Sequence, residues 1–146
     1  MSAEMSTVRL VQFRVYAGEQ DGRGLFVYAR VFATKREMLR ACRVERKASG
    51  QKGGYHPETA GVMQSFERWH GGRRTPCFGR VNLFKGRLGV EVVTHEFAHA
   101  MFAWAWRRNL IAGLAGMPVE EQCCYVLGRM VRRFVARAYK LGLYAE

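Results

Sequence analysis

The order of its periodic segments constrains the fold of this chain most: strand-like segments come first and long helical segments follow. Residues 8–17 alternate between polar and apolar side chains, and residues 25–33 form a second run of β-branched and aromatic side chains. Residues 18–24 between them are rich in glycine and polar side chains, so the two runs predict an antiparallel hairpin. Residues 77–85 predict a further strand, closed by a turn at Gly86.

Helical signals alternate with these strands and then dominate the second half of the chain. Thr34 is a suitable N-cap, and Glu37 stands where a capping box places its partner. Four segments predict helices: residues 35–47, 58–70, 90–108 and 119–141. The sequence therefore predicts the α+β class, with a small antiparallel or mixed sheet packed on three or four helices.

A chain of 146 residues fits one domain, residues 1–146, because two independent cores would need more residues. No uninterrupted apolar run approaches the roughly 18 residues of a membrane-spanning helix. The amino-terminal residues lack the features of a signal peptide. We therefore expect a cytoplasmic protein without a membrane partner.

The four cysteines have spacings that fit neither a disulfide framework nor a structural zinc site. They predict thiols in a reducing compartment, most of which fill the core. These are Cys42, Cys77, Cys123 and Cys124.

The net charge is +12, from 24 Lys and Arg against 12 acidic residues. Such a balance favours nucleic acid or acidic protein surfaces as partners, although solubility alone also explains it. No nucleic-acid-binding motif accompanies the charge. Nucleic acid is therefore a candidate partner on the basis of the charge alone. The spacing of five cationic residues predicts a basic face on the last helix. This face is either solvated or binds an anionic partner. They are Arg129, Arg132, Arg133, Arg137 and Lys140.

The segment His95-Glu96-Phe97-Ala98-His99 carries the clearest chemical signal. Positions i and i+4 share one face of a helix, so His95 and His99 can direct both imidazoles to one metal ion. Glu96 stands one residue further round, where it reaches a metal-bound water rather than the metal. Zinc lowers the pKa of that water to about 7, and a carboxylate then accepts its proton. The pattern predicts one Zn2+ per chain with Glu96 as general base; the alternative is a pair of hydrogen-bonded core histidines.

Residues 92–101, Val-Val-Thr-His-Glu-Phe-Ala-His-Ala-Met, resemble the signature of the zincin metallopeptidases, uncharged flanking positions included. The resemblance implies a hydrolase whose motif helix lies under a small sheet. It also implies that residues 78–85 form the edge strand that holds an extended substrate. The chain further resembles small, uncharacterised metallopeptidase-like proteins of bacteriophages and prophages, which implies the cytoplasm of a bacterial host.

A catalytic zinc takes three protein ligands and leaves one position for water, so the motif requires a third ligand from elsewhere in the chain. Beyond His99 there is no histidine or aspartate. The downstream candidates are Glu120, Glu121, Cys123, Cys124 and Glu146. A resemblance to the gluzincins, whose third ligand is a glutamate of the next helix, favours Glu121 because Cys124 and Gly128 follow it at +3 and +7. Burial on a helical wheel favours Glu120 instead, and both carboxylates also suit a helix's first turn.

Two functions of different kinds follow from these observations. The leading prediction is a zinc metallopeptidase that cleaves a cytoplasmic protein; the same site could also hydrolyse a non-peptide amide. The alternative is a zincin-fold protein that binds or inhibits a partner, host-derived or nucleic-acid-associated, with little or no catalysis. An intact Glu96 favours the enzyme, because a pure binding protein has no use for a general base. His56 and His70 are candidates for stabilising an oxyanion, and otherwise are surface histidines.

Overall fold

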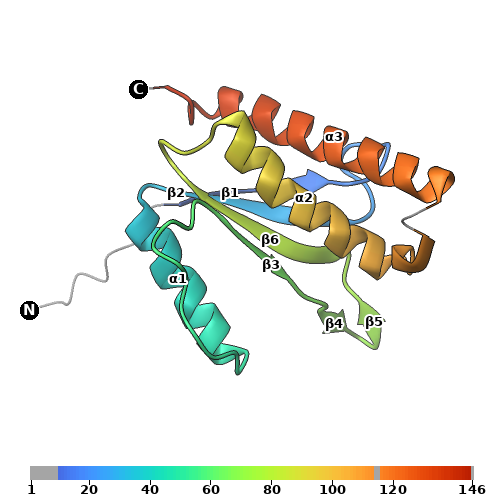
Figure 1. Cartoon of the computed structure of the whole chain (residues 1–146), viewed down its shortest axis with the longest axis horizontal. Coiled ribbons are helices and arrows are strands. Elements are labelled where there is room, and N and C mark those ends of the chain that lie inside the picture. The colour runs from blue at the N-terminus through green and yellow to red at the C-terminus, as the bar shows by residue number, and fades with distance from the viewer. Residues whose placement is uncertain (1–9, 114–115, 146) are drawn as a thin grey trace, which may run out of the picture.

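The computed structural model describes residues 10–113 and 116–145, and its centre is a mixed four-stranded sheet (Figure 1). The strands lie in the order β1 (Leu10–Tyr16), β2 (Phe26–Phe32), β6 (Cys77–Phe84) and β3 (Val62–Ser65). β1 and β2 form the predicted antiparallel hairpin, β2 and β6 run parallel, and β3 is antiparallel to β6. The α+β class and the mixed sheet are thus confirmed.

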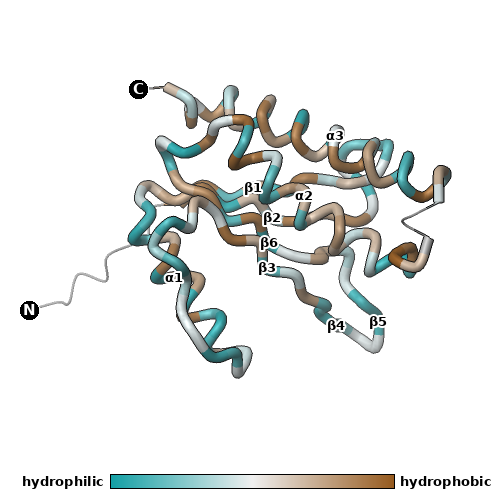
Figure 2. The backbone as a smooth tube through the Cα atoms, viewed as in Figure 1, coloured by the Kyte–Doolittle hydropathy of each residue, from teal (hydrophilic) through white to brown (hydrophobic). Residues whose placement is uncertain are grey.

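Helices cover both faces of this sheet, so β2 is buried on both sides. α2 (Val90–Arg107) and α3 (Met117–Lys140) pack against each other on one face, and α1 (Lys35–Ala48) covers the other (Figure 1). Val27 and Val31 belong to the larger core cluster with α2 and α3, whereas Phe32 belongs to the smaller cluster with Met38 of α1. Hydrophobic and hydrophilic residues alternate along α3, as expected for a helix with one buried side (Figure 2).

Phe134 of α3 is the point where the two long helices and the sheet meet. Its ring centroid lies 5.4 Å from that of Phe97 in α2 and 5.6 Å from that of Phe13 in β1. Aromatic pairs at these separations make favourable contacts beyond the apolar area they bury. Because Phe97 lies inside the His-Glu-x-x-His motif, this contact determines which part of α3 lies beside the motif.

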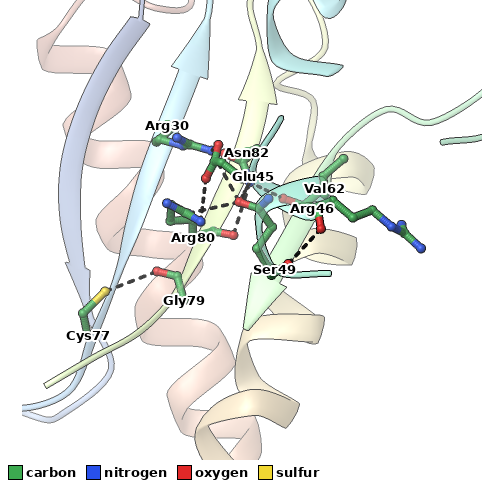
Figure 3. Close-up of polar contacts among 10 residues, drawn as sticks. Arg30, Glu45, Arg46, Ser49, Val62, Cys77, Gly79, Arg80 and Asn82 are labelled. Carbon is green, nitrogen blue, oxygen red and sulfur yellow. Dashed lines mark hydrogen bonds and ion pairs between the residues drawn. The ribbon is translucent and has the colours of Figure 1, made fainter. Parts of the chain in front are cut away.

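Polar side chains between the sheet and α1 hold β3 beside β6 (Figure 3). Arg30 Nε donates to Asn82 Oδ1 at 2.6 Å, and Asn82 Nδ2 donates to the backbone carbonyl of Val62 at 2.9 Å. The Glu45 carboxylate of α1 binds Arg30 at 2.6 Å and Arg80 at 2.5 Å. Each charged side chain of this network therefore has a partner of opposite charge, which offsets the cost of its burial. The network ties the start of β3 to the centre of the sheet.

Most sequence-based element predictions are confirmed to within a few residues. Thr34 is the N-cap of α1, and its hydroxyl accepts a hydrogen bond from the Glu37 backbone N–H at 3.2 Å. The helix predicted over residues 58–70 is wrong: β3 and a two-residue strand, β4 (Trp69–His70), lie there instead. β4 pairs with β5 (Arg73–Arg74) in a separate two-stranded sheet. The backbone of β3 pairs with β6, and that pairing outweighs the local helical signal.

The edge of the sheet also differs from the prediction. β6 was expected to be the edge strand, but it lies between β2 and β3, and β3 forms the edge of the described sheet. Val81 and Leu83 of β6, two residues apart and so on one face of the sheet, are fully buried in the larger core cluster with α2 and α3. The strand beside α2 at the sheet edge is therefore β3.

The basic face of α3 is only partly solvated. Arg129 Nη1 donates to the Ala17 carbonyl at 2.9 Å, and Arg133 Nη1 donates to the carbonyls of Tyr16 at 2.8 Å and Gly18 at 2.6 Å. These two arginines fix α3 to the end of β1 rather than facing an anionic partner. The other three cations are exposed: Arg132, Arg137 and Lys140.

All four cysteines are free thiols, and only Cys124 is exposed, so the prediction that most of them fill the core is confirmed. None of the described helices is long and apolar enough to cross a membrane.

Candidate active site

Helix α2 has one side buried in the core and an exposed side that carries the histidines. Val93, Phe97 and Ala100 follow the spacing of one helical face and are buried in the core. His95 and His99 lie next to each other on the exposed side, with ring centroids 5.0 Å apart and ring planes at 75°. The predicted pair of imidazoles is therefore brought together, with both rings free of the core.

Glu96 is buried, unlike its two histidine neighbours. Burial raises the pKa of its carboxyl group, against the opposing effects of His95 and of a hydrogen bond from the Met63 backbone. Its Oε1 lies 3.9 Å from His95 Nε2. A carboxylate with a raised pKa binds a proton more tightly, which suits a general base.

The backbone just before β3 passes directly against Glu96. A Cβ atom at Gly61 would lie 2.6 Å from Glu96 Cγ, 2.9 Å from Glu96 Cδ and 3.1 Å from Leu83 Cδ2. Only glycine allows this approach without a shift of the neighbouring atoms. The entry to the edge strand and the candidate base are thus packed together, a relation that the sequence did not reveal.

A pocket of about 660 Å³ opens beside Glu96 and His99. This volume lies within the usual range for ligand sites. β3 contributes Met63 and Ser65 to its wall, and Tyr55 comes from the loop after α1. Most of the remaining lining is apolar or aromatic: Phe66, Phe78, Phe102, Trp106 and Ile111. Glu96 and His99 therefore lie at the side of a largely apolar cavity, whose other charged lining residues are Glu67 and Arg107.

The predicted third ligand, Glu121, is not brought to the histidines. Among the described residues, no group of three His, Cys, Asp or Glu side chains is placed to hold a metal ion. Glu121 and Glu120 are exposed near the start of α3. Phe134, which contacts the motif helix, follows Glu121 by about three and a half turns, or about 20 Å of helix.

Neither downstream cysteine completes a site with the histidines. Cys123 is buried and Cys124 exposed in the same early part of α3 as Glu121. Glu146 lies outside the described residues.

The two histidines considered for an oxyanion are not among the residues that line the pocket. His56 and His70 are exposed, and His56 Nδ1 accepts a hydrogen bond from the Glu58 backbone N–H at 3.1 Å. Tyr55 lines the pocket instead, and its hydroxyl is a donor of the kind that stabilises an oxyanion. Nothing in the sequence around Tyr55 distinguishes it from other loop tyrosines.

Two neighbouring imidazoles and a buried carboxylate fit the helical part of a catalytic zinc site, which the donor chemistry of histidine and glutamate favours. The third protein ligand of such a site is not formed by the described residues. Comparison with protein-family models, with curated proteins and with solved structures finds no match to this chain.

Proposed function

We propose that this protein is a zinc-dependent metallopeptidase that hydrolyses peptide bonds of a protein substrate. One observation carries the proposal: Glu96 is buried with a raised pKa, between the exposed His95 and His99 pair and the backbone at the start of β3. The candidate base, one histidine of the pair (His99) and the edge strand β3 then line one pocket.

His95 and His99 would hold the zinc ion, which when bound lowers the pKa of a water molecule to about 7 and polarises the substrate carbonyl. Glu96 accepts the proton of the attacking water at its carboxylate. It then transfers this proton to the amide nitrogen as the carbon–nitrogen bond breaks. Its burial keeps the carboxylate away from bulk water, so the proton stays available for the leaving amine.

The edge strand offers a way to bind the substrate backbone. Alternate N–H and C=O groups of an edge strand point away from its partner, so β3 can accept an extended peptide as an added strand. Because β3 lines the pocket together with Glu96, a peptide bound there passes the candidate base. The role that the zincin resemblance implies for β6 thus falls to β3.

Metal analysis of the purified protein tests the site directly. We expect close to one zinc per chain, and loss of that zinc in His95→Ala and in His99→Ala. His56→Ala and His70→Ala are matched controls, because these histidines are exposed and absent from the pocket lining; they should keep the zinc. Zinc content unchanged in both motif variants would refute the site.

Peptide cleavage tests the role of the base. Glu96→Gln should keep both the zinc and the fold but lose hydrolysis, since it removes a base and not a ligand. Full activity of this variant on a peptide that the wild type cleaves would show that Glu96 is not the base.

A second function, partner binding on a zincin-like fold without catalysis, is favoured by one observation. The described residues do not supply a third zinc ligand. Zinc binding by the wild type with no cleavage of any peptide in a diverse mixture would favour this function over the metallopeptidase.

A further inference from the structure

The β4–β5 hairpin projects from the end of the sheet that carries β3 and β6 (Figure 1). Its turn consists of Gly71 and Gly72, with φ of 58° and 77°. Two successive residues with positive φ form the tight turn that best matches a twisted hairpin, and glycine adopts it without strain. All four strand residues are exposed, and none belongs to either core cluster of the described residues.

The hairpin combines an exposed indole with several cations. Trp69 is 64% exposed and pairs across the strands with Arg74, while His70 pairs with Arg73. The Arg74 guanidinium binds Glu67 at 3.0 Å. Arg73 and the neighbouring Arg68 have no carboxylate partner among the residues that the structure describes, so the hairpin keeps a positive charge.

The base of the hairpin is held firmly. Arg107 of α2 donates from Nη2 to the Thr75 carbonyl at 2.7 Å, and the Phe66 backbone N–H donates to the Phe78 carbonyl at 3.2 Å. The exposed tip is therefore presented on a fixed support. An exposed tryptophan at such a tip buries little apolar surface, so core stability does not explain it.

We propose that the β4–β5 hairpin binds single-stranded nucleic acid. Its Trp69 indole stacks on an unpaired base while Arg68 and Arg73 contact the adjacent phosphates. Exposed aromatic rings beside cations are the elements that bind single strands, since every base has a face for stacking and every linkage a negative charge. A duplex fits less well because its bases are already stacked. The net charge of +12 brings the polyanion to the protein.

Other basic surfaces offer these two elements in a less accessible form. On α3, Arg129 and Arg133 are bound to backbone carbonyls, and the exposed ring of Tyr139 already stacks on Tyr144. The exposed cations of α1 form a stripe without an exposed aromatic ring beside them: Arg36, Arg40, Arg43 and Lys47. The exposed indole of Trp106 also adjoins two arginines, but Arg107 donates to the Thr75 carbonyl and the Arg108 guanidinium lies over the Trp104 ring. At the hairpin, the exposed Trp69 lies beside arginines without a carboxylate partner among the described residues.

Binding of the full chain to a fluorescently labelled 20-nucleotide oligo-dT, measured by anisotropy over a salt titration, tests the proposal. Trp69→Ala should weaken binding at least about fivefold, the lower end of the loss for one stacked base. Arg73→Ala should weaken it and reduce the slope of log affinity against log salt by about 0.7. The matched controls Trp106→Ala and Arg137→Ala remove an indole 70% exposed and an exposed arginine elsewhere, and should change the affinity less than twofold.

Tryptophan fluorescence separates stacking from simple charge attraction. Oligo-dT should quench the tryptophan fluorescence of the wild type and of Trp106→Phe, but not that of Trp69→Phe, which lacks the stacking indole. The melting temperature of Trp69→Phe checks that this variant is folded. Equal losses in Arg73→Ala and Arg137→Ala, equal affinity for the duplex of the same length, or quenching that persists in Trp69→Phe would each overturn the proposal. Glu96→Gln should bind oligo-dT like the wild type, so the result is independent of the proposed peptidase activity.

Discussion

Gly61→Ala is the substitution that most directly tests the packing of the candidate base. The added methyl would lie 2.6 Å from Glu96 Cγ and 2.9 Å from Glu96 Cδ, well inside van der Waals contact. Leu83 closes the third side at 3.1 Å, so the methyl cannot be accommodated without moving the carboxylate or the strand. Forcing one carbon into a packed site costs about 1–3 kcal/mol.

For a domain of this size, that cost corresponds to a fall in Tm of roughly 2–10 °C. The rate of peptide cleavage should fall by more than the loss of folded protein explains, because the clash displaces the carboxylate of the base itself. Thermal denaturation and peptide cleavage, measured on the same preparation, give both quantities. Gly54→Ala is the matched control, since a Cβ there meets nothing within 4 Å.

A double-substitution cycle identifies the cause of the loss. In a Glu96→Ala background the atoms that the new methyl meets first are gone, so Gly61→Ala should cost clearly less stability there. A Gly61→Ala protein that melts with the Gly54→Ala control and cleaves peptide at the wild-type rate would refute the close approach of Gly61 to Glu96.

Three further predictions concern charge and protonation. Glu45→Gln should lower the free energy of unfolding by about 2–4 kcal/mol in urea titrations, because its two arginine partners stay largely buried without a counter-charge. Burial raises the pKa of Cys42 to about 11, so iodoacetamide at pH 8 should label exposed Cys124 and spare Cys42, and stability should fall as pH rises from about 9 to 11. In metal-free protein, Glu96→Gln should raise Tm at neutral pH, because a raised carboxyl pKa costs stability once the group ionises; the gain should vanish below the ordinary glutamate pKa.

The elements that sequence reasoning predicted correctly are those with local signals. α1 begins at a threonine whose hydroxyl caps its own helix, and the β1–β2 hairpin joins neighbouring segments. β3 was mistaken for a helix because its partner, β6, follows it by more than a dozen residues, and no local pattern records that pairing. Gly71 and Gly72, which directly follow the helix predicted over residues 58–70, form the turn of the β4–β5 hairpin.

The candidate site likewise has a part that local sequence predicted and a part that depends on distant contacts. His95 and His99 could be predicted to adjoin because four residues of helix set their spacing. Gly61 and Tyr55 could not be predicted, since their contact with the pocket depends on how β3 and the loop before it reach α2. Arg133 likewise appeared to be one of several surface cations, although it binds carbonyls more than a hundred residues away.

The third ligand depends on the register of two helices, and zinc affinity measured against a competing chelator tests that register. Because Phe134 meets Phe97 and Glu121 lies about 20 Å earlier in α3, we expect Glu121→Ala and Glu120→Ala to change zinc affinity by less than about twofold. His99→Ala should lower it sharply. If the two imidazoles alone hold the zinc, water or a substrate atom would fill its remaining positions. A sharp loss of zinc in Glu121→Ala would instead mean that α3 shifts along α2 by several turns when metal binds, which the contact between Phe97 and Phe134 opposes.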